Sequence, residues 1–279
     1  VVGRVAPEER RSLWLGIVSA GGTGGQMFLV PLNGFLLERM DWSDAILIVA
    51  AFILAIVPMA LISGKASGES LNQEKDTQTL GQALKEAQRN RSYWYLCIGF
   101  FTCGFQVQFV VTHLPNYLQD TGSGVTIGAQ AIALIGLTNV IGTAIAGKLG
   151  GHYKKKDLLM GLYIGRSLVM LAFFVAPLSQ MSVYIFASCI GFLWLATVPL
   201  TAGLISGFFG PRYMATLYAI AFLSHQVGGF LSTWMGGVIR DATGSYDPWW
   251  WIIIAGGALA ALAHYPINET PVKKLATQS

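Results

Sequence analysis

The stretch AIAFLSHQVGGFLSTW, residues 219–234, places a histidine beside a glutamine among residues that are otherwise mostly apolar or small. An imidazole titrates near neutral pH and can donate and accept hydrogen bonds, so His225 with Gln226 could bind a polar solute or carry a proton. Tyr218 lies seven residues earlier, on the same face of a helix. The structural alternative is a histidine hydrogen-bonded across a helix interface, worth about 0.6 kcal/mol. Both interpretations of His225 stay open.

The stretch GFQVQFVVTHLPNYLQD, residues 104–120, repeats this pattern. Gln106, His113 and Tyr117 are spaced i, i+7 and i+11, which predicts one face of a helix. Pro115 follows His113 and should bend that helix. We count Gln106 and His113 among the candidate solute contacts, with a hydrogen bond at an outer gate as the alternative for His113.

Arg166 is the only basic residue deep inside an apolar segment. An uncompensated charge at such a depth costs about 2.5–3.5 kcal/mol on the insertion scale, so some group must face it. The functional interpretation is a cation that binds a carboxylate. The structural interpretation is an arginine bonded to backbone carbonyls or to neighbouring helices.

Two further pairs complete the set of candidates. Asn139 and Thr143 lie four residues apart, and Trp194 shares a face with Thr197 in a segment that we expect to kink at Pro199. Asn139 and Trp194 are candidate solute contacts, although threonine faces of this kind also serve packing and backbone hydrogen bonding.

Composition identifies the solvent around these residues. Of the 279 residues, 53% are hydrophobic and 11% charged, with a mean hydropathy of +0.55, whereas soluble domains carry about 25% charged residues. Runs of about 20 apolar residues predict membrane-spanning helices, and a β-barrel would instead alternate over about 10 residues. We predict eight spans, at roughly 13–36, 44–63, 94–117, 125–149, 158–177, 183–208, 214–238 and 249–266.

The distribution of the net charge of +4 indicates topology and not nucleic-acid binding. If eight spans alternate from a cytoplasmic N-terminus, Arg39 and Arg240 are the only cations in the outer loops. Such a bias predicts that both termini are cytoplasmic, in a multi-pass protein of a bacterial inner membrane. The basic excess could also contact anionic lipid in the bilayer.

The sequence offers little for catalysis or metal binding. No HExxH or GxSxG motif occurs, and all 14 acidic residues lie in loops or at span ends. Cys97, Cys103 and Cys189 lack a CxxC partner, so we interpret them as small packing residues. We therefore predict no enzyme activity, no cofactor and no metal.

An internal repeat relates the start of the chain to the stretch GPRYMATLYAIAFLSHQVGG. At a constant offset, a Pro/Arg loop is followed by a span with paired glycines, and both copies cross the membrane in the same direction. Parallel repeats of this kind are one way in which transporters are built. The matches are Pro7 with Pro211, Leu13 with Leu217, Trp14 with Tyr218, and Gly24–Gly25 with Gly228–Gly229.

Twelve spans in two parallel halves of six resemble the major facilitator superfamily, and this chain would then lack the first four. PEERRSLWLGIVSAGGTGGQMFLVPLNG and LGQALKEAQRNRSYWYLCIGFF resemble its monocarboxylate and oxalate–formate branch, and GKLGGHYKKKD resembles its loop between paired spans. The resemblance divides the chain into the last two helices of the first half (1–63), a central cytoplasmic loop (64–93) and a six-helix second half (94–279). At the end of the central loop, the apolar residues Leu80, Ala83, Leu84 and Ala87 predict an amphipathic helix.

The resemblance implies an all-α helix bundle that moves a small organic anion by alternating access, with a proton as a candidate coupling ion. It places the span of His225 along the central cavity and that of Arg166 at the outside of the bundle. Three departures from the family's patterns limit the carry-over: Gly151 replaces the loop acid, neutral Asn139 and Thr143 replace the branch's acid–arginine pair, and Val30 precedes Pro31 where antiporters carry Gly-Pro. A drug or sugar porter of the same fold, and a channel or structural membrane protein, are the alternatives.

Overall fold

The computed structural model describes residues 78–123 and 125–272, and separate positions between Pro7 and Leu61 that include 39–54. The first predicted span and its glycine run lie mostly outside the described residues, as do 62–77 of the central loop. The described helices are α3 (Trp42–Leu54), α5 (Leu80–Arg89), α6 (Arg91–Asp120), α7 (Val125–Leu149), α8 (Lys155–Val175), α9 (Gln180–Leu193), α10 (Thr197–Phe209), α11 (Met214–Thr243) and α12 (Asp247–His264).

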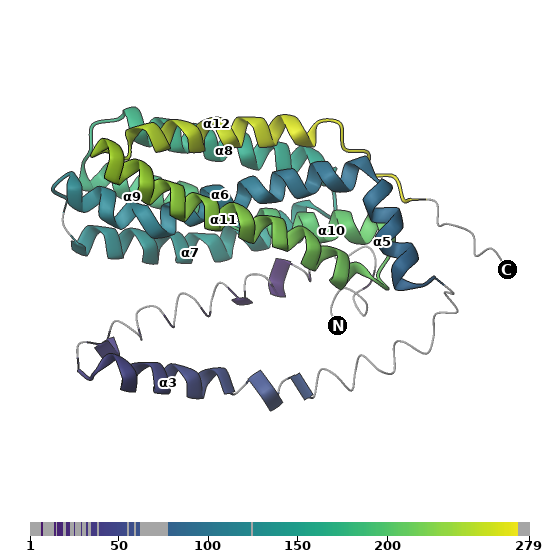
Figure 1. Cartoon of the computed structure of the whole chain (residues 1–279), viewed down its shortest axis with the longest axis horizontal. Helices are drawn as coiled ribbons and strands as arrows, with labels where there is room; N and C mark the ends of the chain where they lie inside the picture. Colours follow the sequence, from purple (N-terminus) through teal and green to yellow (C-terminus); the bar gives the residue numbers. More distant parts are fainter. Residues whose placement is uncertain are drawn as a thin grey trace.

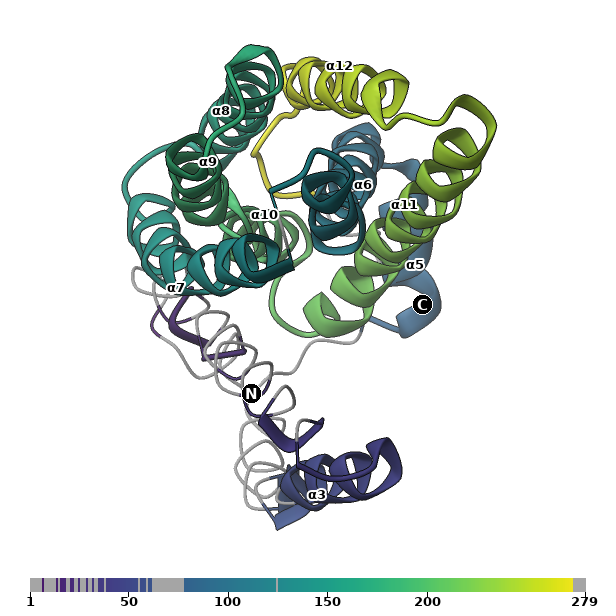
Figure 2. The same ribbon diagram turned by 90° about the vertical axis from the view of Figure 1, so that its left-hand side faces the viewer.

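The helices from α6 to α12 form one bundle, and they cover the six apolar segments predicted after residue 93 (Figure 1). Seen along the bundle, α6 lies inside a ring that contains α7, α8, α9, α11 and α12, and α10 lies nearer the middle than α9 (Figure 2). Helix α3 lies apart from the bundle in both views. The helix-bundle fold class predicted from the sequence is confirmed.

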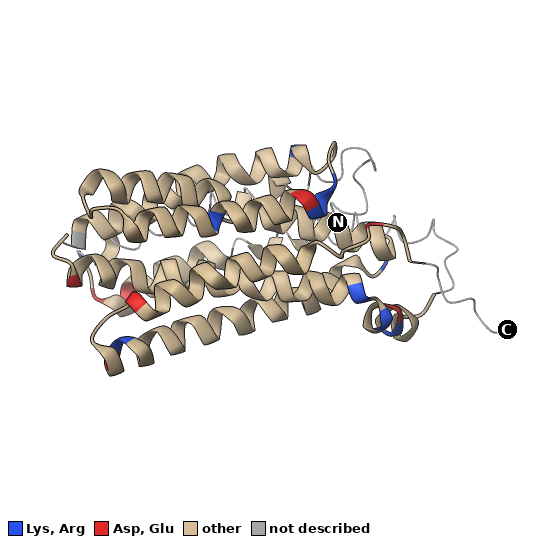
Figure 3. Cartoon of the chain, turned by 90° about the horizontal axis from the view of Figure 1, so that it is seen from above, with Lys and Arg blue, Asp and Glu red and all other residues tan. Residues whose placement is uncertain are grey.

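Five helical stretches of the described chain are long and apolar enough to cross a membrane: α6, Thr126–Leu149 of α7, α8, α11 and the joined stretch Gln180–Phe209. Helix α12 is shorter, with 18 residues. Most charged residues lie toward the ends of the bundle, and most of the ribbon between them is uncharged (Figure 3). This distribution suits helices that pass through hydrocarbon.

The amphipathic helix predicted before the second half is α5. Thr79 and Gln82 close a capping box at its start, with Thr79 Oγ1 accepting from the Gln82 amide at 3.3 Å. Asn90 ends α5 and also caps α6, because its side chain accepts from the Tyr93 amide at 3.1 Å. One asparagine therefore divides the two helices. Of the predicted apolar stripe, Ala83 and Ala87 are buried, Leu84 is partly buried and Leu80 is exposed.

The predicted span 183–208 is two helices, and this changes where the expected kink lies. The chain leaves α9 after Leu193 and enters α10 at Thr197, so the break precedes Pro199. A proline ring would clash with the carbonyl four residues earlier in a continuous helix, which here belongs to Leu195. In α10, Pro199 occupies the first turn, where its missing N–H has no helical partner to lose. Pro115, by contrast, lies within the continuous α6.

Glycines allow α6 and α11 to approach closely along the centre of the bundle. A Cβ added to Gly104 would collide with the His225 backbone carbonyl, and one added to Gly228 would collide with that of Phe101. Small residues at such crossings are the usual means of close helix packing in membranes. The approach holds the α11 residues around His225 against α6.

Candidate solute site and the polar network beside it

His225 lies in the interior of α11, on the side that faces α6. Its ring packs 5.0 Å from the Phe100 ring and 5.1 Å from the Phe222 ring, measured between centroids. Its Nδ1 is 3.1 Å from Oε1 of Gln226, which places the proton on Nδ1 when the ring is neutral. Its Nε2 is buried and makes no hydrogen bond of normal geometry with the described residues.

The neighbours of His225 form the rest of the predicted α11 site. Gln226 is exposed, and Tyr218 is half-buried with its ring 5.8 Å from Phe100 and 6.1 Å from Phe222. The structure therefore brings His225, Gln226 and Tyr218 together with two aromatic rings on one edge of the bundle. Such a surface combines hydrogen-bonding groups with apolar walls, as small-molecule sites do.

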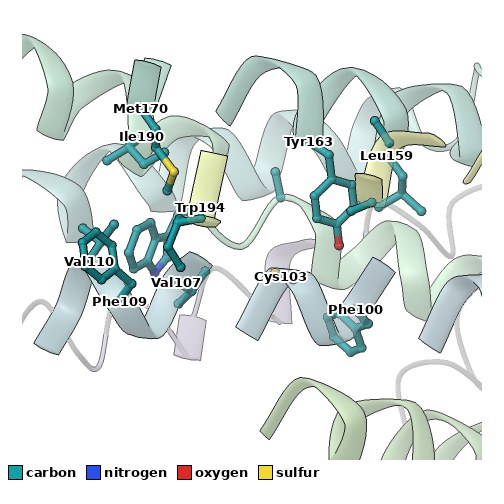
Figure 4. Close-up of a cluster of buried hydrophobic side chains, with 14 of the residues drawn as sticks. Phe100, Cys103, Val107, Phe109, Val110, Leu159, Tyr163, Met170, Ile190 and Trp194 are labelled. Atoms are coloured by element: carbon teal, nitrogen blue, oxygen red, sulfur yellow. The ribbon is translucent and has the colours of Figure 1, made fainter. Parts of the chain in front are cut away.

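Cys103 on α6 connects this surface to the interior of the bundle. Its thiol lies beside the His225 imidazole and 3.2 Å from Thr197 Oγ1 on α10. Nη1 of Arg166 on α8 donates to the same sulfur at 3.3 Å. In a close-up, Cys103 lies on α6 between Phe100 and Val107, and the Tyr163 hydroxyl points toward that helix (Figure 4). We call Arg166, Cys103, Thr197 and His225 the buried polar network.

Arg166 is 1% exposed, and the donors it presents are used inside the protein. Nε and Nη2 donate to the Leu193 carbonyl at 3.0 and 2.9 Å, and Nη2 also donates to the Trp194 carbonyl. These carbonyls end α9, where the helix dipole is negative and the backbone acceptors have no helical partner. The geometry is that of the structural alternative stated for Arg166, with the charge distributed over a helix end.

Asn139 on α7 stabilises the same break between α9 and α10 by bonding to a backbone amide. Its Oδ1 accepts from the Leu195 backbone N–H at 3.0 Å and from Thr143 Oγ1 at 2.9 Å. Asn139 is fully buried, and the Trp194 side chain is also buried, packed in the apolar core beside Val107 (Figure 4). Asn139 and Trp194 therefore lie at the break between α9 and α10 and not beside Gln226.

Gln106 and His113 lie in contacts between helices. Nε2 of Gln106 donates to the Ile253 carbonyl of α12 at 3.2 Å, and Nε2 of His113 is 3.0 Å from the Thr233 carbonyl of α11. Both side chains are buried. Every residue of α6 from Phe100 to Leu114 is buried or partly buried, so a polar side chain in this stretch lies against a neighbouring helix, whereas Gln119 near the end of α6 is exposed. The shared face predicted for Gln106, His113 and Tyr117 therefore packs in the bundle.

Sequence reasoning missed the linking role of Cys103, which we interpreted as a packing residue. Its position three residues before Gln106 carries no signal, because a lone cysteine in an apolar helix usually is a small hydrophobe. The signal that was available is Pro199, since a helix broken before it must have its backbone groups satisfied by other side chains. In the described part of the chain, no group of three or more His, Cys, Asp or Glu side chains could hold a metal ion.

Comparison with known proteins decides the family. Residues 1–233 match the family model described as the Major Facilitator Superfamily. This chain belongs to that superfamily. The membership agrees with the helix bundle, and it makes this a multi-pass integral membrane protein.

The relatives of this superfamily member are named as transporters. It is 24% identical over 249 residues to the uncharacterized MFS-type transporter YcxA of Bacillus subtilis, covering 86% of this chain and 60% of the relative. It is 24% identical over 270 residues to Monocarboxylate transporter 13 of Rattus norvegicus, covering 92% of this chain and 61% of that relative. The chain therefore spans about three fifths of the length of these relatives.

Proposed function

We propose that this protein is a secondary transporter that moves a small organic anion of the monocarboxylate type across a membrane by alternating access. The observation that carries the proposal is His225 beside the exposed Gln226 on α11, with a buried Nε2 that makes no hydrogen bond of normal geometry with the described residues. A carboxylate needs hydrogen-bond donors, and an imidazolium at this position would supply both a donor and a positive charge. The likeness to Monocarboxylate transporter 13 supports the choice of anion.

In this proposal His225, Gln226 and Tyr218 of α11 have different roles in binding the solute. His225 donates from Nε2 to the solute carboxylate when protonated, Gln226 orients the imidazole through Nδ1, and Tyr218 adds a hydroxyl and an apolar wall with Phe222. Uptake of a proton by His225 together with the anion would keep the translocated complex neutral, which lowers the cost of crossing a low-dielectric region. Arg166, Asn139 and Trp194 support the helices around this surface.

The proposed membrane is a bacterial inner membrane, with both termini cytoplasmic, since the outer loops hold few cations. The proposed domains are the last two helices of the first half (1–63), a cytoplasmic loop (64–93) and a six-helix second half (94–279). A drug or sugar porter of the same fold is the second candidate, because the superfamily match alone does not distinguish solutes.

The test uses the full-length transporter in sealed proteoliposomes. Counterflow and pH-driven uptake are measured for labelled monocarboxylates, sugars and organic cations. We expect saturable counterflow of a monocarboxylate, with His225→Ala reducing transport per folded molecule. His225→Gln should preserve counterflow but abolish the response to a pH gradient, while the exposed His152→Gln should behave as wild type. Transport of sugars or cations only would overturn the anion, and normal rates in both His225 variants would overturn the site.

A further inference from the structure

A pocket of about 250 Å³ lies between α7, α8, α9 and α10, away from the His225 surface. It is lined almost entirely by apolar atoms and is partly open to the outside of the bundle. Among its lining residues are Gly142, Ile145, Leu149, Gly161, Phe192 and Leu200.

The pocket follows from the break between α9 and α10. Helix α9 lies in the outer ring between α7 and α8 (Figure 2), whereas α10 is buried along nearly its whole length. Where α9 ends, the chain moves inward, so the outer ring has a gap between α7 and α8. Leu193, Ala196 and Leu200 close the inner wall of that gap.

The lining restricts what can occupy this space. Apolar cavities stay dry, and one of about 150 Å³ already accepts a ring-sized hydrocarbon. Asp157 is the only charged residue among those that line the pocket. A polar solute would lose its hydration here without receiving hydrogen bonds in return, so the occupant of the interior must be a hydrocarbon chain.

Basic residues lie near one end of this apolar pocket, which we call its mouth. Lys154 is the N-cap of α8 and lies about one helical turn before Leu158 of the lining. Lys155 follows it, and Lys148 precedes Leu149 on α7. None of the three lysines forms a salt bridge within the described residues. Lys156 differs, because its Nζ donates to the Tyr265 carbonyl at 3.1 Å. Two carboxylates lie near these lysines: Asp157 in the lining, and Glu269, which accepts from the Lys156 backbone N–H at 2.8 Å. The lysines outnumber them, so this end of the pocket is positive.

From this combination we propose that the pocket binds an anionic phospholipid. One acyl chain fills the apolar space between α7 and α8, and the phosphate lies against Lys148, Lys154 and Lys155 at the end of these helices. Basic residues beside apolar clefts between membrane helices suit such headgroups. A bound lipid would replace the missing outer turns of α9 and support the wall on which the α9–α10 break rests.

The experiment uses the full-length protein in nanodiscs that contain phosphatidylglycerol with a photoactivatable group on one acyl chain. Covalent labelling is mapped by peptide mass spectrometry, and phosphatidylcholine with the same group is the second arm. We expect labelling of the peptides that contain Gly142, Leu162 and Phe192 with phosphatidylglycerol. The double variant Lys154→Gln/Lys155→Gln should weaken this labelling by about 30-fold, while Lys85→Gln/Arg89→Gln on α5 should leave it unchanged.

Filling the pocket tests the acyl chain separately from the headgroup. Gly161→Leu adds a side chain where a Cβ meets nothing within 4 Å, so the backbone can accept it, and Gly237→Leu on α11 is the matched control. We expect loss of the pocket label in Gly161→Leu only. Equal labelling by phosphatidylcholine, or labelling that survives Gly161→Leu, would overturn the proposal. Circular dichroism verifies that each variant is folded.

Discussion

Arg166 and Asn139 bond to opposite polar groups of one helix break. Arg166 donates to the carbonyls of Leu193 and Trp194, and Asn139 accepts from the amide of Leu195. A broken helix in a membrane is tolerated only where the freed backbone groups are satisfied by the protein. Arg166 from α8 and Asn139 from α7 supply these hydrogen bonds to consecutive residues, so the bundle stabilises the break from two neighbouring helices.

The first prediction concerns Asn139. Asn139→Leu keeps the volume but leaves the Leu195 amide without an acceptor, so the free energy of unfolding should fall by about 1–3 kcal/mol. Denaturation of the purified protein in detergent measures the change. Gln119→Leu replaces an exposed amide and is the control, for which we expect little effect. Equal stability of the two variants would contradict the role of Asn139 at the break.

The second prediction separates support from solute binding at Arg166. Arg166→Met should lower the free energy of unfolding by about 3 kcal/mol or more, because two carbonyls lose charge-assisted bonds of about 1.5 kcal/mol each. Arg166→Lys should be intermediate, since one ammonium cannot reach both carbonyls in the fork geometry of a guanidinium. Solute affinity per folded molecule should be unchanged in Arg166→Lys. A variant with normal stability and lost affinity would instead place Arg166 in the solute site.

The third prediction concerns the crossing of α6 and α11. Gly104→Ala should destabilise the protein, because its Cβ would collide with the His225 carbonyl and force the helices apart. Gly237→Ala meets open space on α11 and should be neutral or stabilising by up to about 1 kcal/mol, the difference in helix propensity. Thermal unfolding in the same detergent compares the two variants. If Gly104→Ala were as stable as Gly237→Ala, the close packing of α6 against α11 would be contradicted.

The fourth prediction concerns orientation. The connections that contain Ser123 and Ser245 lie at the same end of the bundle (Figure 1), where Arg240 of α11 pairs with Asp120 of α6 at 3.0 Å. Single cysteines at Ser123 and Ser245 should react with an impermeant maleimide added outside intact cells. A cysteine at Lys155, near the other end, should react only after the cells are opened. External reaction at Lys155 would reverse the proposed orientation.

Much of the bundle could be predicted from the apolar segments. The segment expected at 125–149 is α7 with the same bounds, and the amphipathic stripe before the second half is α5. The segment 183–208 was expected to kink at Pro199, and the structure interrupts it at Trp194–Ala196. A proline excludes a helical carbonyl four residues earlier, so its effect lies upstream of its own position.

The candidate site was harder to predict. Tyr218 and His225 lie seven residues apart on one face of a helix, and Gln226 is the next residue in the chain, so this neighbourhood follows from the sequence and the period of an α-helix. The link from His225 through Cys103 to Arg166 joins α11, α6 and α8, and no spacing along the chain contains it. The same is true of Asn139, whose partner Leu195 lies on a different element.

The sequence by itself determined the solvent and the helices, because 11% charged residues and long apolar runs indicate helices whose backbone groups are satisfied within hydrocarbon. The superfamily rests on the match of residues 1–233 to its family model. Only the tertiary structure decided which polar groups meet. In a segment that is apolar on all sides, every face is equally suited to contact another helix, so the sequence does not specify its rotation. That rotation is set by close packing at positions such as Gly104 and Gly228, and it places Arg166 on the carbonyls of α9 and Cys103 beside His225.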